Sequence, residues 1–169
     1  GPAVLGGQST QLRNGRSQIR GERSIHMGLQ GVQVDFNDLV EEAKALVPNA
    51  KILAASCCGV VGREGVSESM KDMALMAVKG NQFAVASCDQ IYGHNSYEKC
   101  LEMAKSLKAE QPGINMLYFL ASGIDIANDR CIAAFEEIFG ADVTIFGATS
   151  SDNMKGFVSY QGVDENVYE

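Results

Sequence analysis

A chain of 169 residues, 46% of them hydrophobic, is long enough to bury the core of one domain without disulfides or a metal ion. Its formal net charge of −7 opposes nucleic-acid binding by the folded part, because the phosphate backbone is itself anionic. Apolar stretches such as Ile114 to Ala121 are too short to span a bilayer and no secretory leader opens the chain, so we expect a cytoplasmic protein with no membrane or nucleic-acid partner.

The first 30 residues differ from the rest of the chain in charge. They carry a net +3, so that the remainder, −7 less +3, carries −10. The charged residues of this segment are Arg13, Arg16, Arg20, Arg23 and Glu22. A basic segment without aromatic residues is typical of a disordered tail. We predict such a tail over residues 1–30, part of it added to the natural sequence, because Gly1-Pro2 resembles a cleaved fusion and His26-Met27 a cloning junction. A single domain is predicted over residues 31–169.

The first predicted elements of this domain are a strand, a helix and a second strand. Leu29 to Val34 is a weak strand candidate. Between Phe36 and Val47 apolar residues recur at helical spacing, with an aspartate placed to cap the helix and a proline to end it. Lys51 to Ala55 follows as a buried strand, and glycines keep the chain irregular after it.

The middle of the chain predicts a hairpin and a helix. Met70 to Val78 and Gln82 to Cys88 are strand candidates separated by Gly80-Asn81, which is typical of a tight turn. A loop that contains His94 comes next. Ser96 is then placed to cap a helix that has apolar residues on one face.

The last third predicts a buried strand, a helix and two more strands. Ile114 to Ala121 is apolar on both faces, as in a central, covered strand. A helix whose cap is Asn128 or the next residue follows, and then strands over Val143 to Phe146 and Phe157 to Tyr160. This alternation predicts an α/β fold with a mixed, largely parallel sheet and helices packed on its faces. No closing element is evident after Val163, so the domain is expected to be truncated.

Three of the predicted strands end in short loops of glycine and small polar residues. In open α/β sheets ligands lie beyond the carboxyl ends of the strands, where such loops let backbone N–H groups approach an anionic guest. We therefore predict that these loops meet at one edge of the sheet, leave a hollow there and bind a small ligand. The candidate ligand-binding residues are Ser56, Cys57, Gly59, Ser122, Gly123, Asp125, Gly147, Thr149, Asp152 and Asn153. The same residue types are also typical of ordinary turns, an alternative that the sequence leaves open.

The sequence has none of the usual motifs for cofactors or metal ions. It contains no Gly-x-x-x-x-Gly-Lys-Ser/Thr, no Gly-x-Gly-x-x-Gly after a strand and no His-Glu-x-x-His, and it has only two histidines. Its five cysteines include no Cys-x-x-Cys spacing, which argues against a zinc site and a disulfide framework. We therefore predict no cofactor and no metal ion.

An enzyme is the first alternative to a ligand-binding domain. Cys57 or Cys58 would be the nucleophile of a hydrolase or transferase and His94 its base. Asp125 or Asp152 would orient that base. A histidine in a Gly-His-Asn loop is more often a solvated turn residue, so we do not expect an enzyme.

The second alternative is a domain that only binds another protein. A terminal strand with an unpaired edge favours pairing with a further domain or with a second copy in a homodimer. Tyr160 and Tyr168 would belong to such a surface. Stable dimerisation without ligand binding would select this alternative.

Three segments of the chain, in the same order, resemble the FIST N-terminal domain. Ile52 to Val66 resembles the family's strand and the turn after it, with Ser56 and Gly59 matching. Leu117 to Asn128 resembles an apolar strand that leads to a glycine turn, and Val143 to Asn153 resembles a Val-x-Phe-Gly-Gly-x-x-x-Asp-Asp ending. In these two segments the matching residues are Gly123, Gly147 and Asp152.

The resemblance implies a sensory domain of a signal-transduction protein, whose ligand is an amino acid or a related small metabolite. It also implies a FIST C-terminal or other signalling domain as the partner that responds to the ligand. The resemblance covers roughly residues 36–169 and departs at Val60, where the family usually has Glu, so a carboxylate expected near the first loop is missing.

The predicted loops have the chemistry that such a ligand needs. A ligand carboxylate would accept hydrogen bonds from the backbone amides of Gly59, Gly123 and Gly147. Asp125 or Asp152 would pair with an ammonium group.

Overall fold

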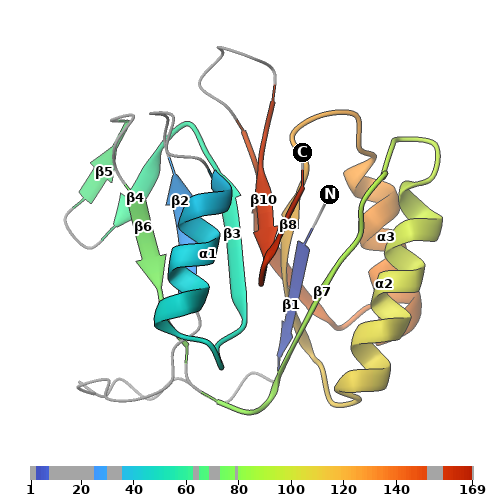
Figure 1. The fold of residues 1–169 in the computed structure, drawn as a ribbon. Coiled ribbons are helices and arrows are strands. Elements are labelled where there is room, and N and C mark those ends of the chain that lie inside the picture. Colours follow the sequence, from blue (N-terminus) through green and yellow to red (C-terminus); the bar gives the residue numbers. More distant parts are fainter. Residues whose placement is uncertain are drawn as a thin grey trace.

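The computed structural model describes residues 3–7, 25–29, 36–62, 65–68, 73–78, 80–151 and 158–168. Within these ranges the chain forms an α/β fold with three helices and eleven strands (Figure 1). The strands are divided between a four-stranded sheet, a five-stranded sheet and a two-stranded ribbon. The predicted α/β class is confirmed, but the described strands do not form one sheet.

The order of the strands brings distant parts of the sequence side by side. The four-stranded sheet has the order β7 (Phe83–Ser87), β1 (Ala3–Gly7), β8 (Met116–Ala121) and β9 (Thr144–Thr149). The five-stranded sheet has the order β11 (Asn166–Tyr168), β10 (Gln161–Val163), β3 (Ile52–Ser56), β2 (Ile25–Leu29) and β6 (Met73–Met76). The ribbon consists of β4 (Val60–Gly62) and β5 (Gly65–Ser67), and the helices are α1 (Phe36–Leu46), α2 (Ser96–Glu110) and α3 (Asn128–Phe139).

The two larger sheets pack face to face, and helices cover their outer faces. Leu53 and Val163 of the five-stranded sheet share a buried cluster with Leu120 of the four-stranded sheet. On the outer side of the five-stranded sheet, Ile52 packs with Val40 of α1. The helices α2 and α3 lie together on the other side of the four-stranded sheet (Figure 1). The described part is therefore layered as helix, sheet, sheet and helix pair.

Strand β8 shows how the sequence produces these layers. Side chains alternate between the two faces of a strand, and this strand is apolar on both. Leu117 and Phe119 lie under α2 and α3, whereas Tyr118 and Leu120 belong to the cluster between the sheets. The predicted central, covered strand is confirmed, because each of its faces meets another layer.

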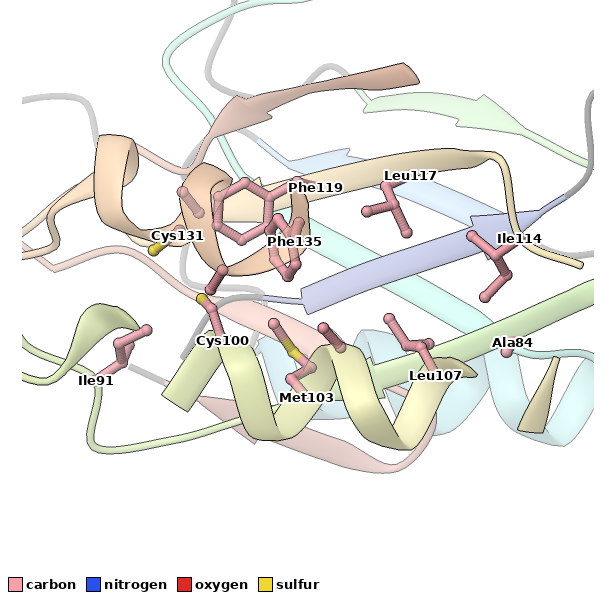
Figure 2. Packing of buried hydrophobic residues seen from close by; sticks show 13 residues of the cluster. Ala84, Ile91, Cys100, Met103, Leu107, Ile114, Leu117, Phe119, Cys131 and Phe135 are labelled. Carbon is pink, nitrogen blue, oxygen red and sulfur yellow. The ribbon is translucent and has the colours of Figure 1, made fainter. Parts of the chain in front are cut away.

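The largest buried cluster, which we call the helical layer, lies between α2, α3 and the four-stranded sheet (Figure 2). Its buried residues are Ala84, Ile91, Cys100, Met103, Ala104, Leu107, Ile114, Leu117, Phe119, Ala121, Cys131, Ala134 and Phe135. The rings of Phe119 and Phe135 meet edge to face, with their centroids 5.1 Å apart. Every one of these side chains is apolar or a thiol, so the cluster holds α2 and α3 on the sheet by burial of apolar surface.

The prediction of a largely parallel sheet is wrong. Among the described strands only β2–β3 and β8–β9 are parallel, and the six other pairs are antiparallel. Each parallel pair is joined through a helix, α1 or α3, as a strand–helix–strand unit. The remaining neighbours arrive without such a crossover, because β1 runs antiparallel between β7 and β8 and β10 runs antiparallel beside β3.

The predicted hairpin between Met70 and Cys88 is also wrong. β6 pairs with β2 in the five-stranded sheet, while β7 pairs with β1 in the four-stranded sheet. The turn residues Gly80-Asn81 therefore lie on a link between the two sheets.

Both ends of the sequence contribute strands that differ from the prediction. Within residues 1–30, predicted as a disordered tail, the structure describes β1 and β2, so the prediction is wrong for these two segments. The weak strand predicted over Leu29 to Val34 reaches the described residues only at Leu29, where β2 ends. The strand predicted at Phe157 to Tyr160 begins later, as β10, and forms a hairpin with β11. The domain boundary at residue 31 and the truncation of the domain stay predictions.

The helix ends agree with the sequence better than their caps do. Ser96 was predicted as the cap of α2 and is instead its first residue: the hydroxyl of Ser96 donates backward to the carbonyl of Tyr92, at 2.7 Å, and Asn95 is the cap residue. Gly140 ends α3 as predicted, with a φ of 93° that favours glycine and its N–H bonded to the carbonyl of Glu136.

Candidate functional site

The carboxyl ends of three strands meet at one edge of the structure, although β3 belongs to the five-stranded sheet and β8 and β9 to the four-stranded sheet, and not to one sheet as predicted. β3 ends at Ser56, β8 ends at Ala121, and Ser150 directly follows β9. The N–H of Ser151 donates to the carbonyl of Ser56 at 3.0 Å, and the N–H of Ser150 donates to the carbonyl of Ala121 at 2.9 Å. We call this region the strand-end junction. It comprises Ser56, Ala121–Gly123, Ser150–Ser151 and Tyr160–Gln161.

The hydroxyl of Ser56 fastens the junction together. It donates to the carbonyl of Ser151 at 3.0 Å and accepts the N–H of Tyr160 at 2.9 Å. The N–H of Ser56 donates to the carbonyl of Tyr160 at 2.8 Å. Ser56 thus joins β3 to the chain on either side of the segment 152–157, and a ligand that accepts the proton of its hydroxyl has to replace the bond to Ser151.

Gly123 has a structural role that the sequence did not distinguish from ligand binding. A Cβ atom at this position would lie 2.1 Å from the carbonyl oxygen of Ser150. Only glycine therefore lets the loop after β8 lie so close to the chain that leaves β9. In the same loop, the hydroxyl of Ser122 accepts the N–H of Ile124 at 3.4 Å and so forms a local turn.

Gly147 lies inside β9 and not in the loop after it. The predicted strand stopped at Phe146, whereas β9 continues to Thr149. Gly147 pairs with Phe119, has a φ of 154°, and would place a Cβ only 1.8 Å from the carbonyl oxygen of Phe119. Its prediction as a loop residue is wrong, because a glycine allows the edge strand to pass close to β8 without ending it. Thr149 is the exposed last residue of this strand.

The prediction missed Gln161, the most completely buried large polar side chain of the junction. Its residue is 1% exposed. The side-chain nitrogen Nε2 donates to the carbonyl of Ala121 at 2.7 Å and to the hydroxyl of Ser150 at 2.6 Å. The side-chain oxygen Oε1 is buried and has no hydrogen-bond partner. The partners of Nε2 lie 40 and 11 residues away in sequence, so no local pattern could have signalled this role.

Buried polar side chains gather at this edge. The described part has four of them, and three, Ser150, Ser159 and Gln161, lie in or next to the strand-end junction. A buried acceptor without a partner costs about 1–3 kcal/mol of folding free energy. Such a cost in a native structure calls for an explanation, and a functional role of the unpaired group is one that is recognised.

The two adjacent cysteines border the junction, and the environment of Cys57 does not activate its thiol. Burial raises the pKa of the Cys57 thiol, an effect that the N–H of Gly59, bonded to this sulfur, only partly offsets. Cys58 is exposed, and its N–H donates to the hydroxyl of Ser151 at 3.1 Å. A nucleophilic cysteine needs a lowered pKa, so Cys57 lacks the activation expected of a nucleophile.

His94 lies in the loop before α2. Its ring stacks on that of Tyr92, with the centroids 5.8 Å apart. Asp125 is exposed, and its Oδ1 lies 3.7 Å from the place that a Cβ of Gly93 would take, so Asp125 approaches this loop. In the described part, no hydrogen bond joins His94 to either Cys57 or Cys58.

Asp152 and Asn153 lie outside the described residues, so both stay predicted ligand contacts. The hollow that the meeting loops were predicted to leave also stays a prediction.

The two tyrosines predicted for a protein-binding surface have internal contacts. Tyr168 packs in the cluster between the sheets, and its hydroxyl is hydrogen-bonded to that of Ser87 at 2.9 Å. Tyr160 packs against the cluster under α1. Both tyrosines are nevertheless only half-buried, and β11 lies at the edge of the five-stranded sheet, so the protein-binding alternative stays a prediction.

Neither a metal cluster nor a membrane helix is found in the described ranges. Over these residues no three His, Cys, Asp or Glu side chains gather closely enough to hold a metal ion. None of the described helices has the length and apolar character needed to cross a bilayer.

Comparison with known proteins gives one match. The family model described as the FIST N domain matches residues 30–169. Neither the curated proteins nor the solved structures include a match.

Proposed function

The chain belongs to the FIST N domain family, and on this premise we propose that it binds a small ligand at the strand-end junction. Domains of this family are sensory domains of signal-transduction proteins. The family has a sensory role, and the proposal locates the ligand of that role at the strand-end junction.

The observation that carries the proposal is the gathering of buried polar groups where the strand ends meet. Ser150 and Gln161 are each 1% exposed, and their hydrogen bonds join the ends of β8 and β9 to the start of β10. A buried site with a few fixed polar groups and an unused acceptor can orient a small polar ligand. The helical layer has no such feature, because its buried residues are apolar or thiols.

The ligand that we propose is an amino acid or a related small metabolite. Its carboxylate would accept hydrogen bonds from backbone amides of the loops after β3 and β8, which include Gly59 and Gly123. The N–H of Gly59 would exchange its bond to the Cys57 sulfur for a bond to the ligand. Gly147 is a weaker candidate because it lies within a strand. The ammonium group would pair with the exposed Asp125 or with Asp152.

We propose no catalytic activity for this domain. The raised pKa of Cys57 keeps its thiol protonated at neutral pH, so it is a poor nucleophile. In this proposal the occupied site acts in the cytoplasm on an attached FIST C-terminal or other signalling domain, or across a homodimer.

Thermal-shift screening followed by calorimetry tests the proposal. The full chain would be screened against the common amino acids and a panel of hydroxy acids, keto acids and amides. We expect at least one compound to raise Tm by roughly 5–10 °C at a hundredfold excess over its Kd. A chain with both Cys57 and Cys58 replaced by serine should bind equally well. Loss of binding in that variant, together with turnover of an ester or amide by the unmodified chain, would support the enzyme instead.

A further inference from the structure

The amide of Gln161 can have only one orientation. Its Nε2 lies 2.7 Å from the carbonyl oxygen of Ala121. If nitrogen and oxygen were exchanged, Oε1 would face that carbonyl oxygen and two acceptors would oppose each other. The donor side of the amide is therefore fixed inward against the end of β8, and Oε1 is left as the free acceptor.

The neighbouring polar atoms cannot satisfy Oε1 by small adjustments. The carbonyl of Ala121 already accepts three donors, which are the N–H of Ser150, the hydroxyl of Ser150 and Nε2 of Gln161. The hydroxyl of Ser150 donates its single proton to that carbonyl at 3.1 Å. No donor in this group remains for Oε1, so its partner has to come from outside the group.

The position of Gln161 indicates what kind of donor fits. Residues two apart in a strand share a face, so Gln161 lies on the same face of β10 as Val163, which packs between the two sheets. Its strand partners are Ala55 and Tyr168, and its hydrogen-bond partners are Ala121 and Ser150. None of these four residues is charged. An ammonium group buried here would lack a countercharge, whereas an uncharged N–H or O–H group needs none.

We infer that Oε1 of Gln161 accepts a hydrogen bond from an uncharged N–H or O–H group of the ligand, such as a carboxamide or hydroxyl. This inference rests on the proposed function and adds to it a residue that determines specificity. It divides the ligand between two regions, with the charged groups at the exposed loops and the neutral polar group at the buried end. Such a site discriminates between ligands by their uncharged N–H or O–H group, because an analogue that lacks this group leaves Oε1 unpaired.

Pairs of amino acids of the same shape test the inference. L-threonine and L-valine differ by a hydroxyl against a methyl group, and L-asparagine and L-aspartate by a carboxamide against a carboxylate. Calorimetry of the full chain would give Kd for all four compounds. We expect the donor-bearing member of at least one pair to bind about tenfold or more tightly than its partner.

Two variants distinguish the loss of the Oε1 acceptor from the general effect of replacing a glutamine by methionine. Gln161→Met keeps the length of the side chain and removes the acceptor, so the difference within the pair should fall below about twofold. Gln82→Met is the matched control, since Gln82 is exposed and outside the junction, and it should keep the full difference. If Gln161→Met does not fold, the side-chain amide resonance of Gln161 in the unmodified chain provides the readout. It should shift with the donor-bearing compound and not with its partner.

Four results would overturn the inference, and they differ in what they say of the proposed function. Equal affinity within both pairs, or a difference that Gln161→Met retains, would mean that Oε1 is satisfied by water alone while ligand binding stands. Binding of another metabolite with the same Kd in Gln161→Met would have the same meaning. If no compound of any class binds the unmodified chain, both the inference and the proposed function fail.

Discussion

The helical layer and the strand-end junction are held together by opposite means. The helical layer packs thirteen buried side chains that are apolar or thiols, including two phenylalanine rings in edge-to-face contact. The strand-end junction is joined by hydrogen bonds between serines, backbone groups and one glutamine, and it leaves a buried acceptor unused. The difference teaches that the first region supplies stability, and that the second gives up some stability to keep polar groups in place. Substitutions in the two regions should therefore affect different properties.

The largest effect on stability is expected from Phe135→Ala in the helical layer. Phe135 has no exposed surface and packs against Phe119, so the substitution removes buried contacts and leaves a cavity. We expect a loss of about 3–5 kcal/mol in the free energy of unfolding, measured by urea denaturation followed by circular dichroism. Phe146→Ala is the control, because Phe146 is 46% exposed and should cost much less. Similar losses in the two variants would contradict the role of this layer.

Gly123→Ala should give the next largest effect, and it acts on the junction. The new Cβ would lie 2.1 Å from the carbonyl oxygen of Ser150, so the backbone of one loop has to move. We expect a loss of about 1–3 kcal/mol in the free energy of unfolding, together with weaker ligand binding. Gly62→Ala is the matched control, since no atom lies within 4 Å of the Cβ it would add. A Gly123→Ala variant as stable as this control would show that the two loops are not held in close contact.

These two regions also differ in how far the sequence predicts them. The helices and β8 follow from apolar residues at helical spacing or on both faces of a strand, and these patterns are local. The meeting of the loops after β8 and β9 was likewise predictable, because a strand–helix–strand unit places the carboxyl ends of its two parallel strands at one edge. That β3 brings its carboxyl end to the same place from the other sheet was not predictable in this way.

The rest depends on contacts between segments far apart in sequence. β1 is made of Ala3–Gly7, a short segment that ends in two glycines and has no alternating strand pattern, and it becomes a strand by pairing with β7 and β8. Its insertion and the separation of β6 from β7 divide the strands into two sheets. Gly147 looks like the start of a loop until Phe119 is seen beside it. Gln161 gains its role from Ala121 and Ser150, which approach it only in the folded chain.

Alkaline pH should distinguish the two regions through their cysteines, with an effect smaller than that of Gly123→Ala. Burial at the edge of the helical layer raises the pKa of Cys88 from 9.0 to about 11. Between these values the unfolded chain releases this proton and the folded chain retains it, so stability is unaffected below pH 9 and falls as the pH rises toward 11.

Replacing Cys88 by alanine should make the decline in unfolding free energy between pH 9 and 11 shallower. Cys58→Ala, at the exposed border of the junction, is the control and should leave the decline unchanged. The measurement is urea denaturation at a series of pH values. An equal decline in the unmodified chain and the Cys88→Ala variant would mean that this thiol is not shielded from water.

The smallest effect on stability is expected from Gln161→Met, although Gln161 is as deeply buried as the residues of the helical layer. The substitution removes the two hydrogen bonds of Nε2, but it also removes the unpaired acceptor Oε1. The carbonyl of Ala121 keeps the N–H and the hydroxyl of Ser150 as donors, so no new unpaired group is created there. Loss and gain are each about 1–3 kcal/mol and oppose each other, so the free energy of unfolding should change by less than about 1 kcal/mol. Urea denaturation without ligand checks this, and a loss as large as that of Phe135→Ala would show that Gln161 serves the fold and not the ligand.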